Sequence, residues 1–216
     1  FSSVLGAKLT EAALQGLMQM QEKLHLTVGR DRRKFSIGLY DLSKIASPVT
    51  FREMPLDDIL FRPLGGNSDM TGREVLQETD KGRKYAHLVG EDSAPVLVDG
   101  KGRIMSMAPI INADFCRVTP ATTDFFIDST GTEEGTDSMV AIVATALAER
   151  GGSIGVTMPG PSFLPQRLRV TGKFVRDYLG KKIKKRTMRR CLEEMRYGYD
   201  GRVLIPPYRT DIFSRI

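Results

Sequence analysis

The apolar and polar residues near the start of the chain follow first a helical and then a strand-like period. After Thr10, apolar residues recur every three or four positions, which predicts an N-capped amphipathic helix that ends near Gly29. Its inward positions are expected to be Leu14, Leu17, Met18, Leu24 and Val28. Residues 35–40 instead alternate between apolar and small or polar side chains, which is typical of a half-buried strand.

A β-hairpin is predicted further along the chain. Between residues 47 and 84 the periodicity is weak, and we expect loops around one short helix over residues 71–77. Residues 94–107 then form two apolar runs around a four-residue turn, DGKG. This turn would place Leu97 opposite Ile104, and Ser106 shares a strand face with Ile104. Leu97 and Ser106 are therefore expected on the same side of the sheet.

A second polar strand face precedes the next predicted helix. The stretch DFFIDST, residues 124–130, predicts a strand on which Asp128 and Thr130 share one face. The following helix should begin near Thr136 or Asp137, and its inward positions are expected to be Met139, Val140, Val143, Ala146 and Leu147. Free N–H groups at the start of a helix favour oxygen-rich ligands, so this strand end is a candidate site.

A proline- and glycine-rich stretch predicts a domain boundary. We expect one domain over residues 1–158, a linker over 159–166, and a second domain over 167–216. In the second domain, Thr171 is expected to cap a helix that ends at Gly180, and Thr187 to cap another. The stretch RVLIPPYR adds a strand stopped by two prolines. Two helices and a strand make an incomplete winged-helix-like unit.

Composition is typical of a folded protein rather than a disordered or membrane-spanning one. The 216 residues are 41% hydrophobic, and no apolar run approaches the roughly 20 residues that a bilayer span needs. The first residues lack the layout of a secretory signal, so we expect a soluble, cytoplasmic protein with no membrane partner. Cys116 and Cys191 fit neither a disulfide framework nor a metal motif, and both are expected to be reduced and buried.

The net charge of +6 is unevenly distributed. Residues 165–216 carry 15 Lys and Arg against 5 Asp and Glu, whereas residues 1–164 carry 17 against 21. A basic segment of this density attracts polyanions, and in the cytosol these are most often nucleic acids. A solvated helix face explains the same composition equally well. The cluster RDRRK at residues 30–34 has the same two interpretations, phosphate contact or exposed loop.

No standard catalytic signature is present in the sequence. P-loop, GxGxxG, GxSxG and HExxH motifs are absent, no metal ligand set is indicated, and His25 and His87 are the only neutral-pH bases. We expect His25 to lie at a helix terminus and His87 to be structural, with a general-base role as its alternative. The remaining candidates form a small polar site with apolar neighbours, made of Leu97, Ser106, Asn112, Asp128 and Thr130. Ordinary turn capping and sheet-edge hydrogen bonding are the alternative.

Several stretches together resemble one enzyme family. SMAPIIN, FIDSTGT and TALAERGG, with QEKLHLTVGRDRRKFSIGLYDLSKI, GRKYAHLV and IPPYRTDI, resemble the β-subunit of archaeal and eukaryotic cytosolic phenylalanyl-tRNA synthetase in the same order. The resemblance covers nearly the whole chain. It implies an α+β fold: a mixed α/β editing domain that contains a β-sandwich, followed by the start of a small winged-helix-like domain.

This resemblance also implies an activity, post-transfer hydrolysis of tyrosine wrongly attached to tRNA(Phe). Carried over by motif, the catalytic residues are Ser106, Asp128 and Thr130. Leu97, Pro109 and Asn112 then bind the substrate. In this assignment Asp128 holds the ammonium, Ser106 and Thr130 hold the ester and water, and Leu97 and Pro109 wall the ring.

The resemblance leaves a rival of another class open, a non-catalytic tRNA-binding or subunit-interface module with the same fold. Nothing in the chain resembles the synthetic core, so ATP and Mg are expected only for the full enzyme, as is the α-subunit partner. One departure stands out. KKIKKRTMRR, residues 181–190, lies where the family often has acidic residues, which implies either extra tRNA contact or a basic surface.

Overall fold

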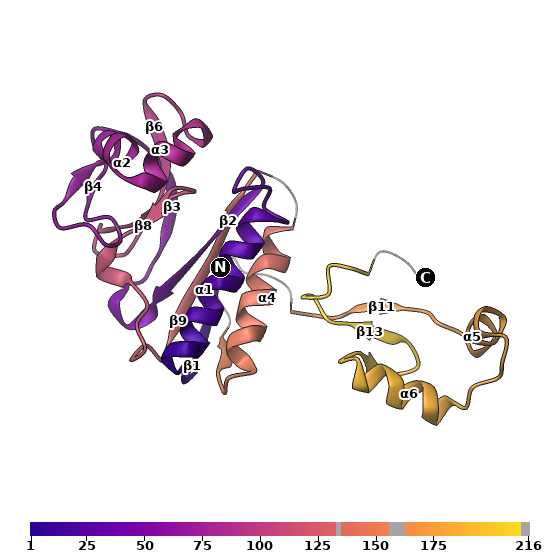
Figure 1. Ribbon diagram of the computed structural model, residues 1–216. Helices are drawn as coiled ribbons and strands as arrows, with labels where there is room; N and C mark the ends of the chain where they lie inside the picture. The colour runs from indigo at the N-terminus through magenta and orange to yellow at the C-terminus, as the bar shows by residue number, and fades with distance from the viewer. Residues whose placement is uncertain (133–134, 156–162, 213–216) are drawn as a thin grey trace. The chain divides into compact units, whose positions relative to one another are not determined.

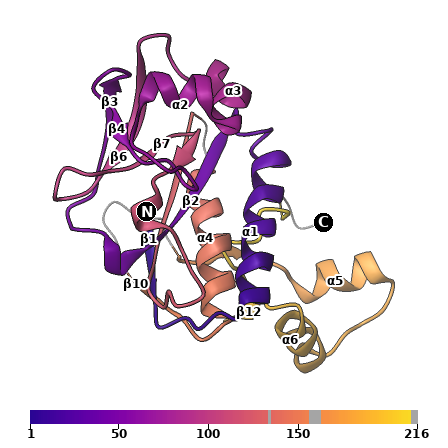
Figure 2. The same ribbon diagram turned by 60° about the vertical axis from the view of Figure 1, so that its left-hand side comes forward.

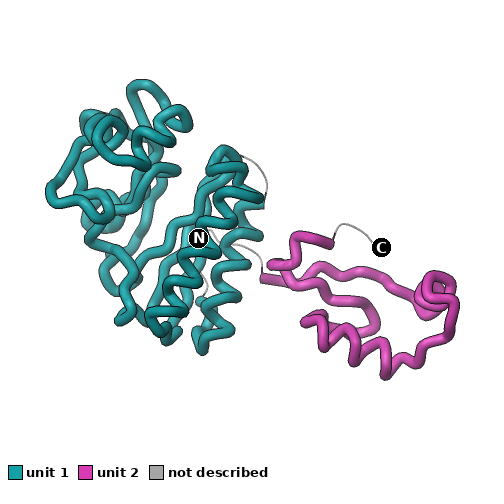
Figure 3. The backbone as a smooth tube through the Cα atoms, viewed as in Figure 1, with its two compact units in different colours: residues 1–160 teal, residues 161–216 magenta. Residues whose placement is uncertain are grey.

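The chain folds into two compact units, residues 1–160 and 161–216 (Figure 3). The computed structural model describes residues 1–132, 135–155 and 163–212 (Figure 1). Residues 159–162 of the predicted linker 159–166 are outside the described residues, and Gln166 already begins a strand. Each unit has its own hydrophobic core.

The first layer of unit 1 is an antiparallel sheet with the strand order β10-β1-β9-β2. Its strands are β1 (Ser2–Leu5), β2 (Phe35–Asp41), β9 (Phe125–Gly131) and β10 (Ser153–Gly155). Helices α1 (Glu11–Leu26) and α4 (Thr136–Ala148) lie side by side against this sheet (Figures 1 and 2). The Thr10 hydroxyl accepts the N–H of Ala13, as its predicted capping role requires. The exposed Val28 lies beyond the end of α1, so its predicted inward position is wrong.

Strand β2 is buried along its whole length, whereas its alternation predicted a half-buried strand. The reason is a second layer that covers the polar face. Ser36, Gly38 and Tyr40 pair with Thr130, Asp128 and Phe126 of β9, and side chains of paired residues share a face. This shared face is the one turned to the second layer, because Tyr40 and Phe126 pack in its core.

That second layer is also an antiparallel sheet, with the order β3-β6-β7-β8. Its strands are β3 (Thr50–Pro55), β6 (Ser93–Val98), β7 (Ile104–Met107) and β8 (Ile111–Asn112). A two-stranded ribbon of β4 (Leu60–Phe61) and β5 (Met70–Thr71) adjoins it, with helices α2 (Gly72–Glu78) and α3 (Asp80–Tyr85). Three short 3₁₀ helices complete the described part of the unit: η1 (Leu42–Lys44), η2 (Ala86–Leu88) and η3 (Asp114–Cys116). The α+β class predicted from the sequence is confirmed.

The hairpin forms, but its register differs from the prediction. Leu97 pairs with Ser106, and Ile104 pairs with Val98, because a β-bulge shifts the register between Leu97 and Val98. Leu97 is therefore not opposite Ile104. Direct pairing still places Leu97 and Ser106 on one face of the sheet, as expected.

Unit 2 contains a three-stranded antiparallel sheet and two helices among its described residues. Its elements are β11 (Gln166–Leu168), α5 (Gly172–Leu179), α6 (Lys185–Glu194), β12 (Gly198–Tyr199) and β13 (Val203–Ile205), with strand order β11-β13-β12. Thr171 caps α5 and Gly180 ends it, as expected. Thr187 does not cap α6, because Lys184 is the N-cap and Thr187 lies inside the helix. Cys191 is exposed, in contrast to its predicted burial, whereas Cys116 is buried.

Asp99 holds the hairpin turn to the loop before β3. Its carboxylate accepts the backbone N–H groups of Ala46, Lys101 and Arg103 at 3.2, 3.0 and 2.9 Å, and the Arg103 guanidinium at 2.6 Å. Burial alone would raise the pKa of Asp99, but these hydrogen bonds outweigh it and hold the pKa below its usual value. The stabilisation is therefore present above the ordinary carboxylate pKa and is lost as the pH falls through the lowered one.

We expect Asp99→Ala to lower the free energy of unfolding by about 3 kcal/mol at neutral pH, because it leaves several donors unpaired. Urea unfolding measures this. Asp92→Ala is the control, since the Asp92 side chain is 93% exposed and should change stability by less than about 0.5 kcal/mol. Equal stability of the two variants would contradict the role of Asp99.

Candidate functional site

A small polar cavity lies between the two layers of unit 1. Its volume is about 20 Å³, roughly the space of one water molecule. One side comes from β2 and β9 and the other from β7, β8 and the turn between them. The described residues that line it include Arg32, Ser36, Gly38, Tyr40, Ser106, Pro109, Asn112 and Asp128.

Asp128 is the buried acid of this cavity. Its side chain is 2% exposed, and its Oδ1 atom has no hydrogen-bond partner among the described residues. Burial raises the pKa of Asp128 to about 6, although a hydrogen bond from Tyr40 partly offsets the rise. A buried carboxylate with a free acceptor atom is unusual, because buried polar atoms are almost always paired. The free atom points to a missing donor.

Tyr40 connects Asp128 to the opposite layer. Its hydroxyl lies 3.1 Å from Ser106 Oγ and 3.4 Å from Asn112 Oδ1. The phenol has one proton, so it donates to only one of Ser106, Asn112 and Asp128 at a time. Burial, and then the charge of Asp128, raises the pKa of Tyr40 far above its usual value, so the phenol keeps its proton. Ser106 and Asn112 are themselves cross-strand partners on β7 and β8. The predicted trio of Ser106, Asn112 and Asp128 therefore does converge.

Two predicted site residues lie elsewhere. Leu97 is fully buried in the core beside Ser106, its cross-strand partner. Thr130 pairs with Ser36, and the Ser36 Oγ is 3.0 Å from Thr130 Oγ1. Neither is among the described residues that line the cavity. Pro109 does line it, at the turn between β7 and β8. The site is thus smaller and more polar than the sequence suggested.

A larger cavity adjoins the small one and opens toward α1. Its volume is about 280 Å³, near the lower limit for sites that hold a small molecule. The two cavities share the lining residues Arg32, Ile37, Ile111 and Asn112, so they are next to each other. Glu22, His25 and Lys81 also line the larger cavity.

Sequence reasoning missed Tyr40, Gly38 and Arg32. Tyr40 and Gly38 lie on the polar face of β2, which the alternating pattern predicted to be exposed to solvent. The signal that could have identified them is that this face carries polar and small residues, as the face of the Asp128 strand does. Arg32 was expected in an exposed loop or on phosphate, but it is buried at 7% exposure. His25 is buried and accepts the N–H of Ile37 at 2.9 Å, whereas His87 is exposed. Neither histidine lines the small cavity.

The arrangement can bind and orient a polar ligand. It offers an acid for a cation, a phenol as donor and an amide and a hydroxyl for further hydrogen bonds. In the part of the chain that the structure describes, no group of three or more His, Cys, Asp or Glu could hold a metal ion. No helix within the described residues is long and apolar enough to cross a membrane.

The fold and the cavity define an α+β protein whose two antiparallel layers enclose a small polar site. No family model matches the chain. Known proteins do. The chain is 40% identical to the phenylalanine–tRNA ligase β-subunit of Archaeoglobus fulgidus, over 97% of this chain and 41% of that protein. It is 37% identical to that of Methanococcus maripaludis, over 100% and 41%.

A solved structure agrees with these relatives. It is an N-terminal fragment of the phenylalanyl-tRNA synthetase β-subunit from Pyrococcus horikoshii, with a TM-score of 0.86 and 36% identity. The match covers 98% of this chain and 65% of that one. The chain therefore belongs to the archaeal-type phenylalanine–tRNA ligase β-subunit family. It spans about two fifths of the length of the curated relatives it matches.

A substitution at Gly38 tests how closely Asp128 and Tyr40 pack against β2. A Cβ at this position would meet Asp128 Oδ1 and the Tyr40 hydroxyl, so we expect Gly38→Ala to destabilise the protein by about 1–3 kcal/mol. Gly16→Ala is the matched control, because nothing lies near its Cβ position and alanine favours a helix by about 0.5–1 kcal/mol. Urea unfolding of both variants measures the difference. A Gly38→Ala protein as stable as wild type would contradict the close packing.

Proposed function

We propose that this cavity is a hydrolytic editing site that removes tyrosine from mischarged tRNA(Phe). The observation that carries the proposal is the unpaired, buried Oδ1 of Asp128, surrounded by the Tyr40, Ser106 and Asn112 groups. Membership of the ligase β-subunit family supports the substrate class, since a pocket made for phenylalanine cannot strongly reject an analogue that only adds a hydroxyl.

In this proposal Asp128 binds the α-ammonium of the attached amino acid. An ammonium supplies the donor that Oδ1 lacks, and the pair compensates the cost of burying the carboxylate. The ring then lies toward the larger cavity beside Pro109. The Tyr40, Ser106 and Asn112 cluster faces the ester and the attacking water. Thr130 acts through Ser36 and Leu97 through the packing of Ser106, so both are supporting residues.

The cavity residues can also select tyrosine over phenylalanine. A polar group that pairs with the phenol remains desolvated and unpaired when phenylalanine is bound. Such a mismatch costs about 1–3 kcal/mol. Glu22, His25 and Lys81 line the larger cavity and are the candidates for this contact.

The chemical step needs a positioned water molecule. The water oxygen attacks the ester carbonyl carbon, and the bond between that carbon and the ribose oxygen breaks. The proton that the water loses passes to the leaving ribose oxygen, which becomes a hydroxyl. The small cavity holds one group of the size of a water molecule, and in this proposal the ammonium takes that space. The attacking water is then held from the side of the larger cavity, beside Asn112, which lines both cavities. Since no histidine lines the small cavity, orientation by Asn112 and by the adjacent ribose hydroxyl is the proposed source of the rate gain.

Transfer RNA is the proposed macromolecular partner, together with the ligase α-subunit. ATP and Mg are proposed to belong to the synthetic reaction of the full enzyme, since no stretch of this sequence resembles the synthetic core. Unit 2 supplies the basic surface, since Lys181, Lys182, Lys184 and Lys185 are exposed and make no ion pair among the described residues. The rival, a non-catalytic tRNA-binding or interface module, predicts tRNA binding without hydrolysis.

We expect Asp128→Asn to lose most Tyr-tRNA(Phe) hydrolysis while gaining stability. The pKa of about 6 means that the native state resists ionisation of this carboxyl, so folding stability is lost as the pH rises from about 4 to 6. A neutral amide removes that cost, on the order of 2 kcal/mol at pH 7.5. Single-turnover deacylation and urea unfolding measure the two effects.

In the wild type, hydrolysis should rise with pH through about 6 as Asp128 ionises. Asp124→Asn is a control for loss of a carboxylate outside the cavity; Asp124 accepts the N–H of Gly6. Unchanged hydrolysis in Asp128→Asn would exclude the assignment. An inactive wild type that still binds tRNA would favour the rival module.

The basic surface makes a separate prediction. Replacing Lys181, Lys182, Lys184 and Lys185 by Gln should weaken tRNA binding and flatten its dependence on salt, by about 0.7–0.9 in the log–log slope for each phosphate that is no longer neutralised. Replacement of the same four residues by Arg keeps the charge and serves as the control. Filter binding between 50 and 200 mM salt measures the slopes. Identical slopes for all three proteins would show that these lysines do not contact tRNA.

A further inference from the structure

Arg32 ends an unusual turn after α1. Three consecutive residues, Arg30, Asp31 and Arg32, have left-handed φ angles of 49°, 56° and 65°. Side chains other than glycine rarely adopt this conformation, and each such residue costs on the order of 1 kcal/mol. The turn is held by backbone hydrogen bonds, among them Arg32 N–H to the His25 carbonyl at 3.2 Å. Its result is that the Arg32 side chain points into the protein.

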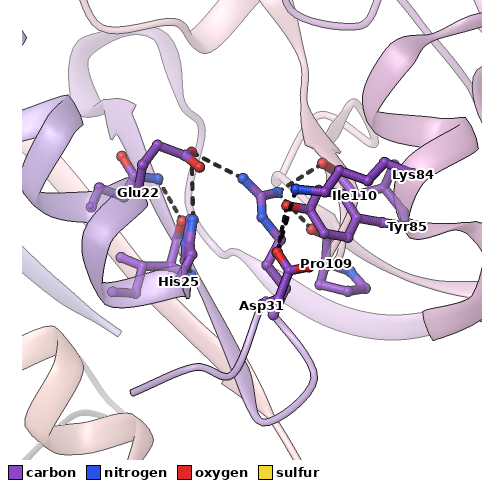
Figure 4. Close-up of polar contacts among 10 residues, drawn as sticks. Glu22, His25, Asp31, Lys84, Tyr85, Pro109 and Ile110 are labelled. Atoms are coloured by element: carbon purple, nitrogen blue, oxygen red, sulfur yellow. Dashed lines mark hydrogen bonds and ion pairs between the residues drawn. The ribbon is translucent and has the colours of Figure 1, made fainter. Parts of the chain in front are cut away.

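The buried guanidinium makes contacts with two separate parts of unit 1. Nη1 donates to the carbonyls of Pro109 and Ile110 at 2.9 and 3.0 Å, and Nη2 donates to Glu22 Oε1 at 3.0 Å. It also lies over the ring of Tyr85, 4.8 Å from the centroid. Figure 4 labels these partners, with Glu22 of α1 on one side and Pro109 and Ile110 of the β7–β8 turn on the other.

The ion pair with Glu22 offsets the cost of burying the Arg32 guanidinium. The pKa of Glu22 is lowered to about 2, first by contact with His25, whose Nδ1 atom lies 3.5 Å from Glu22 Oε1, and then by the charge of Arg32. These effects outweigh burial, which would raise the pKa. Glu22 is therefore ionised at neutral pH. Asp31 also holds this turn in place, since its carboxylate accepts a hydrogen bond from the Tyr85 hydroxyl at 2.9 Å (Figure 4).

The two groups of Arg32 partners correspond to the two halves of the cavity. Asp128 and Tyr40 belong to the layer against which α1 packs, whereas Ser106 and Asn112 flank the turn whose carbonyls Arg32 binds. Between the strands of the two layers that line the cavity, the hydrogen bonds among the described residues run through the Tyr40 hydroxyl. A planar guanidinium with fixed donors can set the separation between the layers, which one phenol cannot do alone.

We propose that Arg32 is a positioning residue, which holds the β7–β8 turn so that Ser106 and Asn112 stay aligned with Asp128. This inference rests on the proposed hydrolysis at that cavity. In this proposal Arg32 acts through the Pro109 and Ile110 carbonyls. Lysine retains the charge but cannot donate in one plane to two carbonyls and a carboxylate.

The test uses the whole chain and single-turnover hydrolysis of Tyr-tRNA(Phe). Arg32→Lys should lower the hydrolysis rate by up to about 100-fold, since misplacement near 1 Å has that effect, while the Kd for tRNA changes less than about twofold. Arg32→Ala should also be slow, and millimolar guanidinium chloride should restore part of its activity by occupying the vacated site. Arg33→Ala, an exposed residue of the same cluster, is the matched control and should match wild type.

The outcomes separate this inference from the proposed function. A wild type that does not hydrolyse Tyr-tRNA(Phe) overturns the proposed function itself. An active wild type with an equally active Arg32→Lys variant overturns the positioning role alone. If both Arg32 variants fail to fold in circular dichroism melts, Arg32 is a stability residue and the inference is wrong. A folded, slow Arg32→Ala that guanidinium does not rescue, with Arg32→Lys unchanged, also overturns it.

Discussion

The polar residues inside unit 1 are arranged around one constraint, the burial of the Asp128 carboxyl between two antiparallel layers. Asp128 has a free acceptor atom and a pKa raised by its surroundings, so it makes the interior less favourable than a fully paired side chain would. The fold accommodates this cost through apolar packing around it, with Tyr40 and Phe126 joining the core of the second layer. A site that destabilises the protein in this way is typical of a residue kept for binding.

The surrounding residues follow from the position of Asp128. Gly38 leaves the space that its carboxyl needs, Tyr40 shares its strand face, and Ser106 and Asn112 meet the phenol from the other layer. Arg32 connects α1 to the turn between β7 and β8. The two faces of β2 therefore differ. Ile37 and Leu39 contribute to apolar packing, whereas Ser36 and Tyr40 supply hydroxyl groups and Gly38 leaves room for the Asp128 carboxyl.

Many of the helices and strands were predictable from the sequence, because they depend on residues that are close together in the chain. Periodicity and caps indicated α1, α4, α5 and the hairpin, because a helix start or a strand face depends on neighbouring residues. The pairing of Leu97 with Ser106 was not, since a β-bulge shifts the register without a distinctive residue. Burial of β2 on both faces, and of Arg32, depends on residues that are distant in the sequence. The cavity-lining trio of Ser106, Asn112 and Asp128 was found from polar residues on apolar strands, but Tyr40 was not, because nothing local indicated that its face meets a second sheet.

The protonation of Asp128, in the free protein and in the presence of a tyrosyl ester analogue, tests the role of this carboxyl most directly. Titration of its ¹³C carboxyl resonance, with a non-hydrolysable tyrosyl-adenosine amide as the added ligand, measures both states. We expect a pKa near 6 in the free protein that falls on binding, because the ligand ammonium pairs with Oδ1. A pKa at the ordinary value for aspartate, or one that the ligand leaves unchanged, would contradict this role.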